Sequence, residues 1–372
     1  MRILIAPDSF KNCLTARAVA EALADGIRSV CSDAQIDIIP LSDGGDGLLS
    51  VISERVGGKL IECQTRDPLG RAIKAAWLKT DNYAIIEMAL ASGLSLLKYP
   101  EEYAPLLTST FGTGLLIKMA IESGSSNIIV GLGGSATIDG GAGMASALGY
   151  QLLDSAGMKI REGGGALNRL DSIHTGKINT RLRDINVIAL TDVDNRLLGA
   201  SGAAQVYGPQ KGASKNDVEI LERNLNHLAA IIERDLSMSV SDIPGAGAAG
   251  GLGAGCTAFL SAELKPGALW VAEHVGLSDI LPDVDLVFTG EGQVDKQTAF
   301  GKVPAIVGQL ARRFDKPVIA FAGSVRDAAG LHAIGIKKYI QIAPPEATLA
   351  ESIRDAKKNL AKAAAAFINK AW

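Results

Sequence analysis

The stretch DLVFTGEGQVDKQTAFGKVPAIVGQLARRFDKPVIAFAG, residues 285–323, decides the fold class of this chain. It begins with DLVFTG and ends with PVIAFAG, two apolar runs of strand length, and an amphipathic helical pattern begins near Val303 between them. A strand, a helix and a second strand in this order form a unit whose strands are parallel and covered by helices. The same alternation continues into residues 337–343 and also starts the chain, where ILIA (3–6) precedes a helical stretch at 16–30. We therefore predict an α/β protein with a doubly wound, mostly parallel sheet of the Rossmann or flavodoxin type.

The middle of the chain has a different pattern. Three short runs, 59–65, 72–80 and 83–89, are separated by turn residues at 67–68 and 81–82, which favours an antiparallel meander. A chain of 372 residues is also longer than one hydrophobic core usually serves. We therefore predict a second, inserted mixed α/β domain. We assign residues 1–58, 96–145 and 270–372 to the doubly wound domain, and residues 59–95 and 146–269 to the inserted domain.

The composition excludes several classes of function. Lysine and arginine (37) nearly balance aspartate and glutamate (40), and no basic cluster exceeds a pair, so we expect no nucleic-acid binding. No apolar run reaches the length of a membrane span, and the four cysteines show no C-x-x-C spacing. We expect a cytoplasmic protein that binds neither a membrane nor structural zinc. The composition leaves both a monomer and a homodimer open.

Four loops that combine acidic residues with glycine follow predicted strands. They are SDGGDG (42–47), GLGGSATIDGGAG (131–143), TDVDN (191–195) and TGEGQVD (289–295). Ligands of open α/β sheets bind beyond the carboxyl ends of the strands, so we expect these loops to meet at one crevice. Glycine lets backbone N–H groups surround an anion, and carboxylates beside a phosphate need a hard cation such as Mg²⁺ between them. A single DGG is more often only a turn, but four such loops favour phosphoryl transfer.

Lysines in strand-end loops are further candidates. Lys11 follows the first strand, Lys211 lies in YGPQKG, and Lys302 precedes the helix predicted from Val303. A lysine at such a position can neutralise charge that develops on a transferred phosphate. The run GAGAAGGLGAG (245–255) is open to three interpretations: a flexible connection, a backbone nest or a close-packed helix start.

A second class of enzyme stays open on a nucleotide signature. The chain has no G-x-x-x-x-G-K-[ST], but Gly131, Gly133 and Ala136 fit G-x-G-x-x-A after a strand, with Asp154 near the expected acidic position. This pattern keeps an NAD(P)-dependent hydroxy-acid dehydrogenase as the alternative. Against it, TIDGGAG follows Ala136, and a dinucleotide-binding helix should not open with so many glycines.

The whole chain also resembles the bacterial glycerate kinase family, the type that is neither a P-loop nor a sugar-kinase fold. The strings that carry the resemblance are IAPDSFK (5–11), PLSDGGDG (40–47), IEMALASGL (86–94), TSTFGTG (108–114), GLGGSATIDGGAGM (131–144), DVDN (192–195), YGPQKGA (207–213), PGAGAAGGLG (244–253) and TGEGQVDKQTAFGK (289–302). The chain departs from the family at Asn12 and Cys13, where small residues such as Gly and Ser are expected.

The resemblance implies a two-domain α/β enzyme with its active site in an interdomain cleft. It also implies ATP-dependent phosphorylation of D-glycerate, usually at the 2-hydroxyl to give 2-phosphoglycerate, with the 3-hydroxyl as the alternative. The implied partners are thus two small molecules, glycerate and ATP, together with Mg²⁺.

From the loops and the resemblance together we assign roles as hypotheses. Asp192 is the expected base for the substrate hydroxyl, and Lys11 the expected catalytic lysine. The residues expected to bind glycerate are Asp8, Ser9 and Arg66. Those expected to bind ATP are Gly133, Gly134, Ser135, Asp139, Gly140 and Lys302. The expected magnesium ligands are Glu291 and Asp295, with Asp43 or Asp46 as a further one.

Overall fold

The computed structural model describes residues 1–176, 178, 180–294, 301–326 and 331–371. Asp295, one of the expected magnesium ligands, lies outside the described residues. The chain divides into two compact units, and each is described by itself. Unit 1 comprises Met1–Asp43, Ser50–Val56 and Pro266–Trp372, and unit 2 comprises Gly44–Leu49 and Gly57–Lys265.

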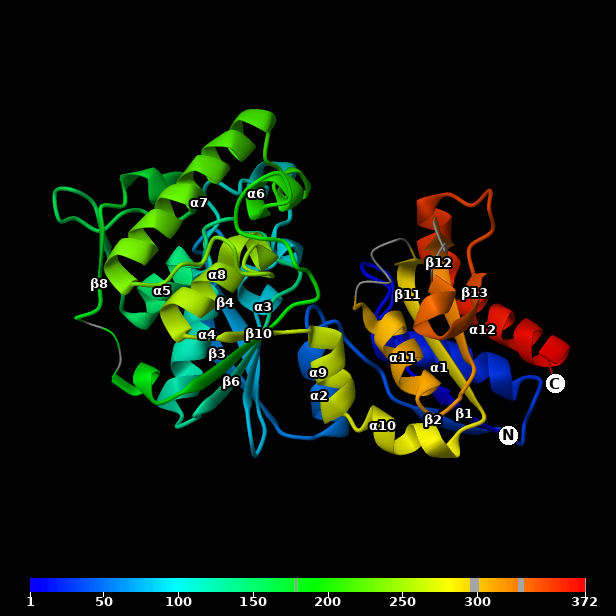
Figure 1. Ribbon diagram of the computed structural model, residues 1–372. Helices are drawn as coiled ribbons and strands as arrows, with labels where there is room; N and C mark the ends of the chain where they lie inside the picture. The colour runs from blue at the N-terminus through cyan, green and yellow to red at the C-terminus, as the bar shows by residue number, and fades with distance from the viewer. Residues whose placement is uncertain (177, 179, 295–300, 327–330, 372) are drawn as a thin grey trace. The chain divides into compact units, whose positions relative to one another are not determined.

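Unit 1 is built on a five-stranded sheet whose strand pairs are all parallel. In spatial order the strands are β13 (Ile336–Gln341), β12 (Val318–Val325), β11 (Leu286–Val294), β1 (Arg2–Ile5) and β2 (Gln35–Ile38). β1, the first strand of the chain, pairs with β11 on one side and β2 on the other (Figure 1). The parallel, mostly apolar sheet predicted from the two chain ends is confirmed.

Unit 1 also contains helices, several of which pack on this sheet. They are α1 (Ala16–Arg28), α2 (Leu48–Arg55, which begins in unit 2), α9 (Gly267–His274), α10 (Leu277–Ile280), α11 (Val303–Arg312) and α12 (Leu349–Ala371). Leu23 of α1 and Leu360 of α12 share one core with Phe288 and Phe321 of the strands. α1 and α12 approach so closely at Gly26 that an added Cβ would lie 2.2 Å from the carbonyl oxygen of Ala361. This contact joins the two ends of the chain.

Unit 2 contains a six-stranded mixed sheet. In spatial order its strands are β10 (Glu263–Lys265), β9 (Asn186–Leu190), β6 (Asn127–Gly131), β5 (Ala84–Glu87), β4 (Ala72–Lys79) and β3 (Lys59–Arg66). β3, β4 and β5 pair antiparallel, which confirms the predicted meander, whereas β5, β6, β9 and β10 pair in parallel. A separate two-stranded sheet joins β7 (Gln151–Leu153) to β8 (Ser172–His174).

The helices of unit 2 are α3 (Ala89–Ser92), α4 (Phe111–Glu122), α5 (Ala142–Leu148), α6 (Ala203–Tyr207), α7 (Lys215–Leu236) and α8 (Ala248–Leu260). The longest, α7, begins at a capping box in which Ser214 and Asp217 satisfy each other's backbone N–H groups. No helix in the described part of the chain combines the length and the hydropathy that a bilayer crossing requires.

The division between the units differs from the predicted one at residues 96–145. We expected this segment to join the chain ends, but it lies in unit 2, where β6 is hydrogen bonded between β5 and β9. The reason is that an apolar strand followed by a helix fits any parallel sheet. The pattern predicts the orientation of such a strand but does not say which sheet it joins.

Candidate active site

Three of the predicted glycine-acid loops lie at one edge of the unit 2 sheet. β6 and β9 are parallel neighbours, so the segments that follow them leave the sheet at the same edge. Leu132 N–H donates to Leu190 O at 2.9 Å, which aligns the start of the 131–143 loop with the start of the 191–195 loop. Residues 44–47 of the SDGGDG loop also belong to unit 2. The fourth loop, at 289–295, starts in unit 1.

The SDGGDG loop packs directly on the glycine turn that follows β6. A Cβ on Gly133 would lie 2.4 Å from Cα of Gly45, and one on Gly134 would lie 2.4 Å from Oδ1 of Asp46. Gly134 also has φ +63°, in the left-handed region that favours glycine. Gly133 is therefore required for the close approach of two backbones and Gly134 for its left-handed conformation, and the approach brings the Asp46 carboxylate next to the turn.

Glu87 holds the SDGGDG loop in place, a role that sequence reasoning missed. Its side chain is buried at the end of β5, where Oε1 accepts from Gly47 N at 3.0 Å and Oε2 accepts from Leu49 N at 3.1 Å. The sequence held one sign of this role, a glutamate at the end of the apolar strand in IEMALASGL. Its apolar neighbours predict only a buried strand, so they do not indicate which groups the carboxylate binds.

The backbone of the glycine turn presents unused donors. Leu94 N donates to Gly134 O at 2.8 Å and Ala136 N donates to Ser92 O at 2.9 Å, which fixes the turn against the end of α3. Within the described residues, the N–H groups of Gly133, Gly134 and Ser135 donate to no acceptor. Consecutive free amides of this kind form a nest that suits an anion.

Asp139 and Gly140, expected to contact ATP, belong to the framework of the loop instead. The Asp139 carboxylate is fully buried and accepts from Thr110 N and Oγ1, both at 2.8 Å, and from Gly141 N and Gly143 N, both at 3.1 Å. Burial raises the pKa of Asp139, and these hydrogen bonds oppose the rise. A Cβ on Gly140 would lie 2.4 Å from a leucine side chain of α7. These contacts give the two residues a structural part in the loop: the carboxylate of Asp139 accepts hydrogen bonds from the backbone of its own glycine-rich segment.

Lys211 lies under the same turn. Its side chain is 2% exposed, and Nζ donates to Ser135 Oγ at 2.7 Å and to Thr137 O at 2.8 Å. Burial lowers the pKa of Lys211 to about 7, although the negative charge of Asp139 acts in the opposite direction. The YGPQKG string made this lysine a candidate, but only the structure connects it to Ser135.

The remaining expected residues of unit 2 are Asp192 and Arg66. Asp192 is half-buried and follows β9 directly after Thr191, at the same sheet edge as the glycine turn. Arg66 ends β3, where its guanidinium carbon lies 4.8 Å from the Phe111 ring centroid and Nη1 lies 3.6 Å from Oε1 of Glu162. Both contacts engage the Arg66 guanidinium within its own unit.

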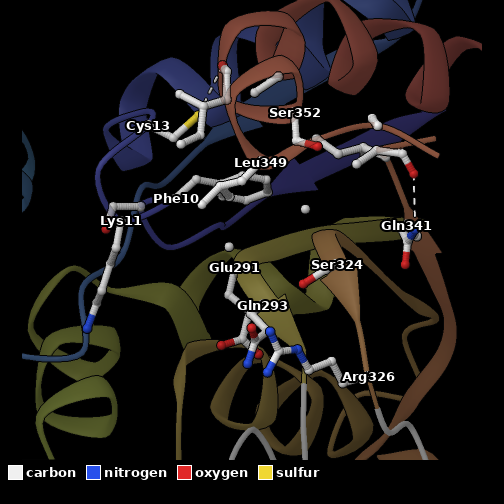
Figure 2. Close-up of a pocket in the computed structure, with 18 of the residues that line it drawn as sticks. Phe10, Lys11, Cys13, Glu291, Gln293, Ser324, Arg326, Gln341, Leu349 and Ser352 are labelled. Atoms are coloured by element: carbon white, nitrogen blue, oxygen red, sulfur yellow. Dashed lines mark hydrogen bonds between the residues drawn. The ribbon is translucent and has the colours of Figure 1, made fainter. Parts of the chain in front are cut away.

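Unit 1 has a pocket of about 530 Å³ at the carboxyl ends of its strands (Figure 2). Six of the expected residues line it, and the structure therefore brings them together. They are Asp8, Ser9, Lys11, Asp43, Glu291 and Lys302.

One end of this pocket carries alternating charges. Lys11 Nζ lies 3.0 Å from Oδ2 of Asp43, and Lys302 Nζ lies 3.3 Å from Oε2 of Glu291. Asp8 is buried beside them. Its burial and then the charge of Asp43 raise the pKa of its carboxyl well above the ordinary value. Carboxylate oxygens, which can bind a metal ion, thus alternate here with ammonium groups, which can bind phosphate. This arrangement suits a phosphate together with a hard cation.

The rest of the pocket is apolar on one side and polar on the other. Figure 2 shows Phe10 and Leu349 opposite Glu291, Ser324 and Arg326. Sequence reasoning missed Ser324 and Arg326. Gly323 and Asp327 flank them, but one glycine and one acid at the end of an apolar strand do not mark a ligand loop by themselves.

The carboxylates fit a magnesium ion only with help from a ligand. Among the described residues, no group of three His, Cys, Asp or Glu side chains could hold a metal ion. Mg²⁺ usually binds through one or two carboxylates together with substrate phosphates and water. The carboxylates of Asp43 and Glu291, which line the same pocket of unit 1, are consistent with that mode.

The dinucleotide signature does not act as one. Asp154 is part of a turn, where its carboxylate accepts from Ala156 N at 3.0 Å, Met158 N at 2.9 Å and Arg169 Nη2 at 3.1 Å. The helix after β6 begins only at Ala142, so the glycine turn does not open a helix. The geometry gives no support to the dehydrogenase alternative.

Comparisons with known proteins agree with one another. The model of the family described as the glycerate kinase family matches residues 3–371. A glycerate 2-kinase of Escherichia coli (strain K12) is 44% identical over 366 residues, which cover 98% of this chain and 96% of that protein. A glycerate kinase of Bacillus subtilis (strain 168) is 42% identical, with coverage of 98% and 96%. A crystal structure from Salmonella typhimurium LT2, provisionally named glycerate kinase 2, superposes with a TM-score of 0.83 at 40% identity and covers 100% of this chain and 98% of that one.

Proposed function

The chain belongs to the glycerate kinase family and is a kinase, and from this premise we propose that it transfers the γ-phosphoryl group of ATP to the 2-hydroxyl of D-glycerate. The products are 2-phosphoglycerate and ADP. The observation that carries the phosphoryl-transfer chemistry is the run of amides at Gly133, Gly134 and Ser135, which donate to no acceptor in the described part of the chain. The 2-position is favoured by the name of the Escherichia coli relative, a glycerate 2-kinase.

The glycine turn binds the ATP phosphates. The N–H groups of Gly133, Gly134 and Ser135 and the Ser135 hydroxyl donate hydrogen bonds to phosphate oxygens. Their positions are fixed by packing on Gly45 and on the end of α3, so binding requires little reorganisation of the backbone.

Asp192 accepts the proton of the substrate hydroxyl. An ordinary aspartate has a pKa near 4, so it is a weak base, and its effect comes from being held within hydrogen-bond reach of the hydroxyl. Its position directly after a buried parallel strand favours such a fixed geometry.

The charged end of the unit 1 pocket binds anionic groups. Lys11 and Ser9 bind the glycerate carboxylate or the transferred phosphoryl group, and Lys302 binds a phosphate of ATP. Each ammonium is already paired with a carboxylate, Lys11 with Asp43 and Lys302 with Glu291, which holds both side chains in position before a ligand arrives.

Asp43 and Glu291 are the described residues of unit 1 that would hold Mg²⁺. Asp46 and Asp295 stay predicted as further ligands. The ion would neutralise charge on the phosphate oxygens.

Release of ADP with a panel of small hydroxy acids, including D- and L-glycerate, tests the proposal. We expect ADP release with ATP, Mg²⁺ and D-glycerate together, and phosphorus-coupled NMR of the product should assign the phosphate to carbon 2. A phosphate on carbon 3 would correct the position of transfer. Failure to release ADP with either enantiomer would contradict the proposed substrate.

A further inference from the structure

Lys211 is a buried amine in a fixed frame. It ends a short 3₁₀ turn, Pro209–Lys211, and the following residue, Gly212, has φ +93°. A Cβ on Gly212 would lie 2.1 Å from the carbonyl oxygen of Tyr103, so the backbone here is tightly held. The amine has three N–H donors at most, and two of its contacts are to Ser135 Oγ and Thr137 O. The side chain therefore has little freedom to turn away from the glycine turn.

The surroundings of this amine favour a balance between its charged and neutral forms. The charged group that acts on it is the buried carboxylate of Asp139, and the Tyr207 ring centroid lies 5.8 Å from Nζ. Asp194 acts on Tyr207, whose pKa is raised to about 12 mainly by burial, so that ring stays neutral at ordinary pH. Because burial brings the pKa of Lys211 to about 7, both of its forms are populated near neutrality.

The Ser135 hydroxyl connects the amine to the free amides. Its oxygen accepts the hydrogen bond from Lys211, so its own O–H is left to donate to another group. The N–H groups of Gly133, Gly134 and Ser135 are available beside it. An anion bound to these donors is therefore connected to Nζ of Lys211 through a single intervening group, the Ser135 hydroxyl. Thr137 Oγ1, buried in the same segment, has no partner within the described residues, so the site still has unused polar capacity.

We propose that Lys211 is a positioning residue that responds to the charge of the bound nucleotide. When a phosphate group binds at the glycine turn, the amine of Lys211 takes up a proton from solvent, and the resulting ammonium holds the Ser135 hydroxyl in the orientation that donates to the phosphate. One N–H bond forms at Nζ, and the bond that held this proton in its solvent or buffer donor breaks; no other bond changes. The inference rests on the proposed function, because it requires ATP to bind at this turn.

The direction of the effect follows from electrostatics. A negative charge close to an amine stabilises the ammonium form, so a bound phosphate increases the proton occupancy of Lys211. By linkage, protonation strengthens phosphate binding by the same factor. Where the free enzyme holds the amine neutral, affinity for the nucleotide falls by up to about tenfold for each rise of one pH unit.

Isothermal titration calorimetry with magnesium–ATP measures this proton directly. Titrations at about pH 8 in buffers with different heats of ionisation give the number of protons taken up, and we expect the wild type to approach about one. Lys211→Met removes the amine and should bind with no uptake from this site, and more weakly. Lys215→Met, an exposed lysine four positions along the chain, is the matched control and should behave as the wild type.

The outcomes separate the inference from the function on which it depends. Equal proton uptake by the wild type and Lys211→Met, or binding by the wild type with no uptake, contradicts the inference alone. No binding of magnesium–ATP by the wild type contradicts the proposed function and the inference with it.

A second measurement does not depend on the folding of Lys211→Met. NMR of the wild type labelled with ¹³C at the lysine ε-carbon should show one signal that titrates near neutral pH. Magnesium–ATP should move that titration to higher pH. The absence of such a signal, or a titration that the nucleotide leaves unchanged, would overturn the inference.

Discussion

Two aspartates near the edge of the unit 2 sheet show that burial and hydrogen bonding determine the role of a carboxylate. Asp139 is fully buried, and donors of its own loop and of Thr110 fill its oxygens. Asp192 is half-buried in a loop directly after a strand. Both lie in acidic, glycine-rich or polar strings, so the sequence alone does not separate them. Their solvent access does, and it favours Asp192 for chemistry.

Replacing Asp192 tests this assignment. Asp192→Asn keeps the size of the side chain but removes the base, so kcat should fall by about 10²-fold or more. The affinity for ATP and the melting temperature should stay close to those of the wild type. Steady-state kinetics with calorimetry and thermal unfolding give all three values.

Asp194→Asn is the matched control for this variant. Asp194 is exposed and lies two residues further along the same loop, so its kcat should remain near that of the wild type. If Asp192→Asn retained nearly full turnover, or if both variants lost it equally, Asp192 would not be the base.

Other residues show what the sequence could and could not predict at this scale. The departure from the family at Asn12 is accommodated, because Asn12 has φ +60° and asparagine tolerates the left-handed region better than most residues. The burial of Lys211 and the hydrogen bonds of Glu87 could not be predicted from the sequence. Both depend on which distant segments pack over these residues. A sequence motif indicates which residue types a site contains. The packing around these residues then determines their pKa values and their hydrogen-bond partners.

At the scale of elements, the site depends on two loops that touch along their backbones. The turn after β6 and the SDGGDG loop approach until only hydrogen fits at Gly133. Because Glu87 anchors the second loop, the two loops and the end of β5 form one connected frame.

Gly133→Ala should separate these loops. Its φ is not in the left-handed region, so the effect is steric, and the added methyl group meets Cα of Gly45. We expect a loss of about 1–3 kcal/mol in the free energy of unfolding and a fall of about tenfold or more in affinity for magnesium–ATP. Denaturant unfolding and calorimetry measure the two effects.

Gly176→Ala is the control, because an added Cβ there meets none of the described residues within 4 Å and its φ is also outside the left-handed region. It should leave ATP affinity unchanged. Wild-type affinity in Gly133→Ala would show that the turn tolerates displacement and does not bind the phosphates through its backbone.

Most strands and helices could be predicted from periodicity, and the helix from Val303 begins where expected, with Lys302 as its N-cap. The run at 245–255 resolves in favour of a close-packed helix start. α8 begins at Ala248, and a Cβ on Gly253 would lie 2.3 Å from the carbonyl oxygen of Gly245. Composition alone could not distinguish this from a flexible connection, since both require glycine.

At the scale of the whole molecule, Lys211 connects folding stability to pH. Its pKa is about 7 in the folded protein and about 10.4 in an unfolded chain, so between these values the unfolded chain binds a proton that the folded protein does not. The cost of burying this amine is therefore complete below about pH 7 and is relieved as the pH rises. The contribution to the free energy of unfolding increases by up to about 1.4 kcal/mol per pH unit.

Urea unfolding of the wild type and Lys211→Met at several pH values between about 7 and 9 tests this prediction. The wild type should gain stability relative to the variant as the pH rises, because the variant lacks the titrating group. Other ionisable groups contribute equally to both proteins and cancel in the difference. A difference that does not change with pH would show that the amine stays charged in the folded state.

The division of the chain was the part of the fold that sequence reasoning predicted least well. The parallel sheet of unit 1 and the meander of unit 2 were both expected, but residues 96–145 joined the other unit. Strand pairing between distant segments depends on side-chain fit across the sheet, and hydrophobic periodicity does not record that fit.

The position of β1 between β11 and β2 also sets the order in which the protein can be made. Its partner β11 leaves the ribosome some 280 residues after it, and α12, which covers α1, is translated later still. Most of unit 2 is one continuous segment and can fold while synthesis continues. Until β11 and α12 are translated, the apolar strand and helix of the nascent N-terminal segment lack these partners and are exposed to aggregation. Slow translation or a chaperone at this stage would therefore affect unit 1 far more than unit 2.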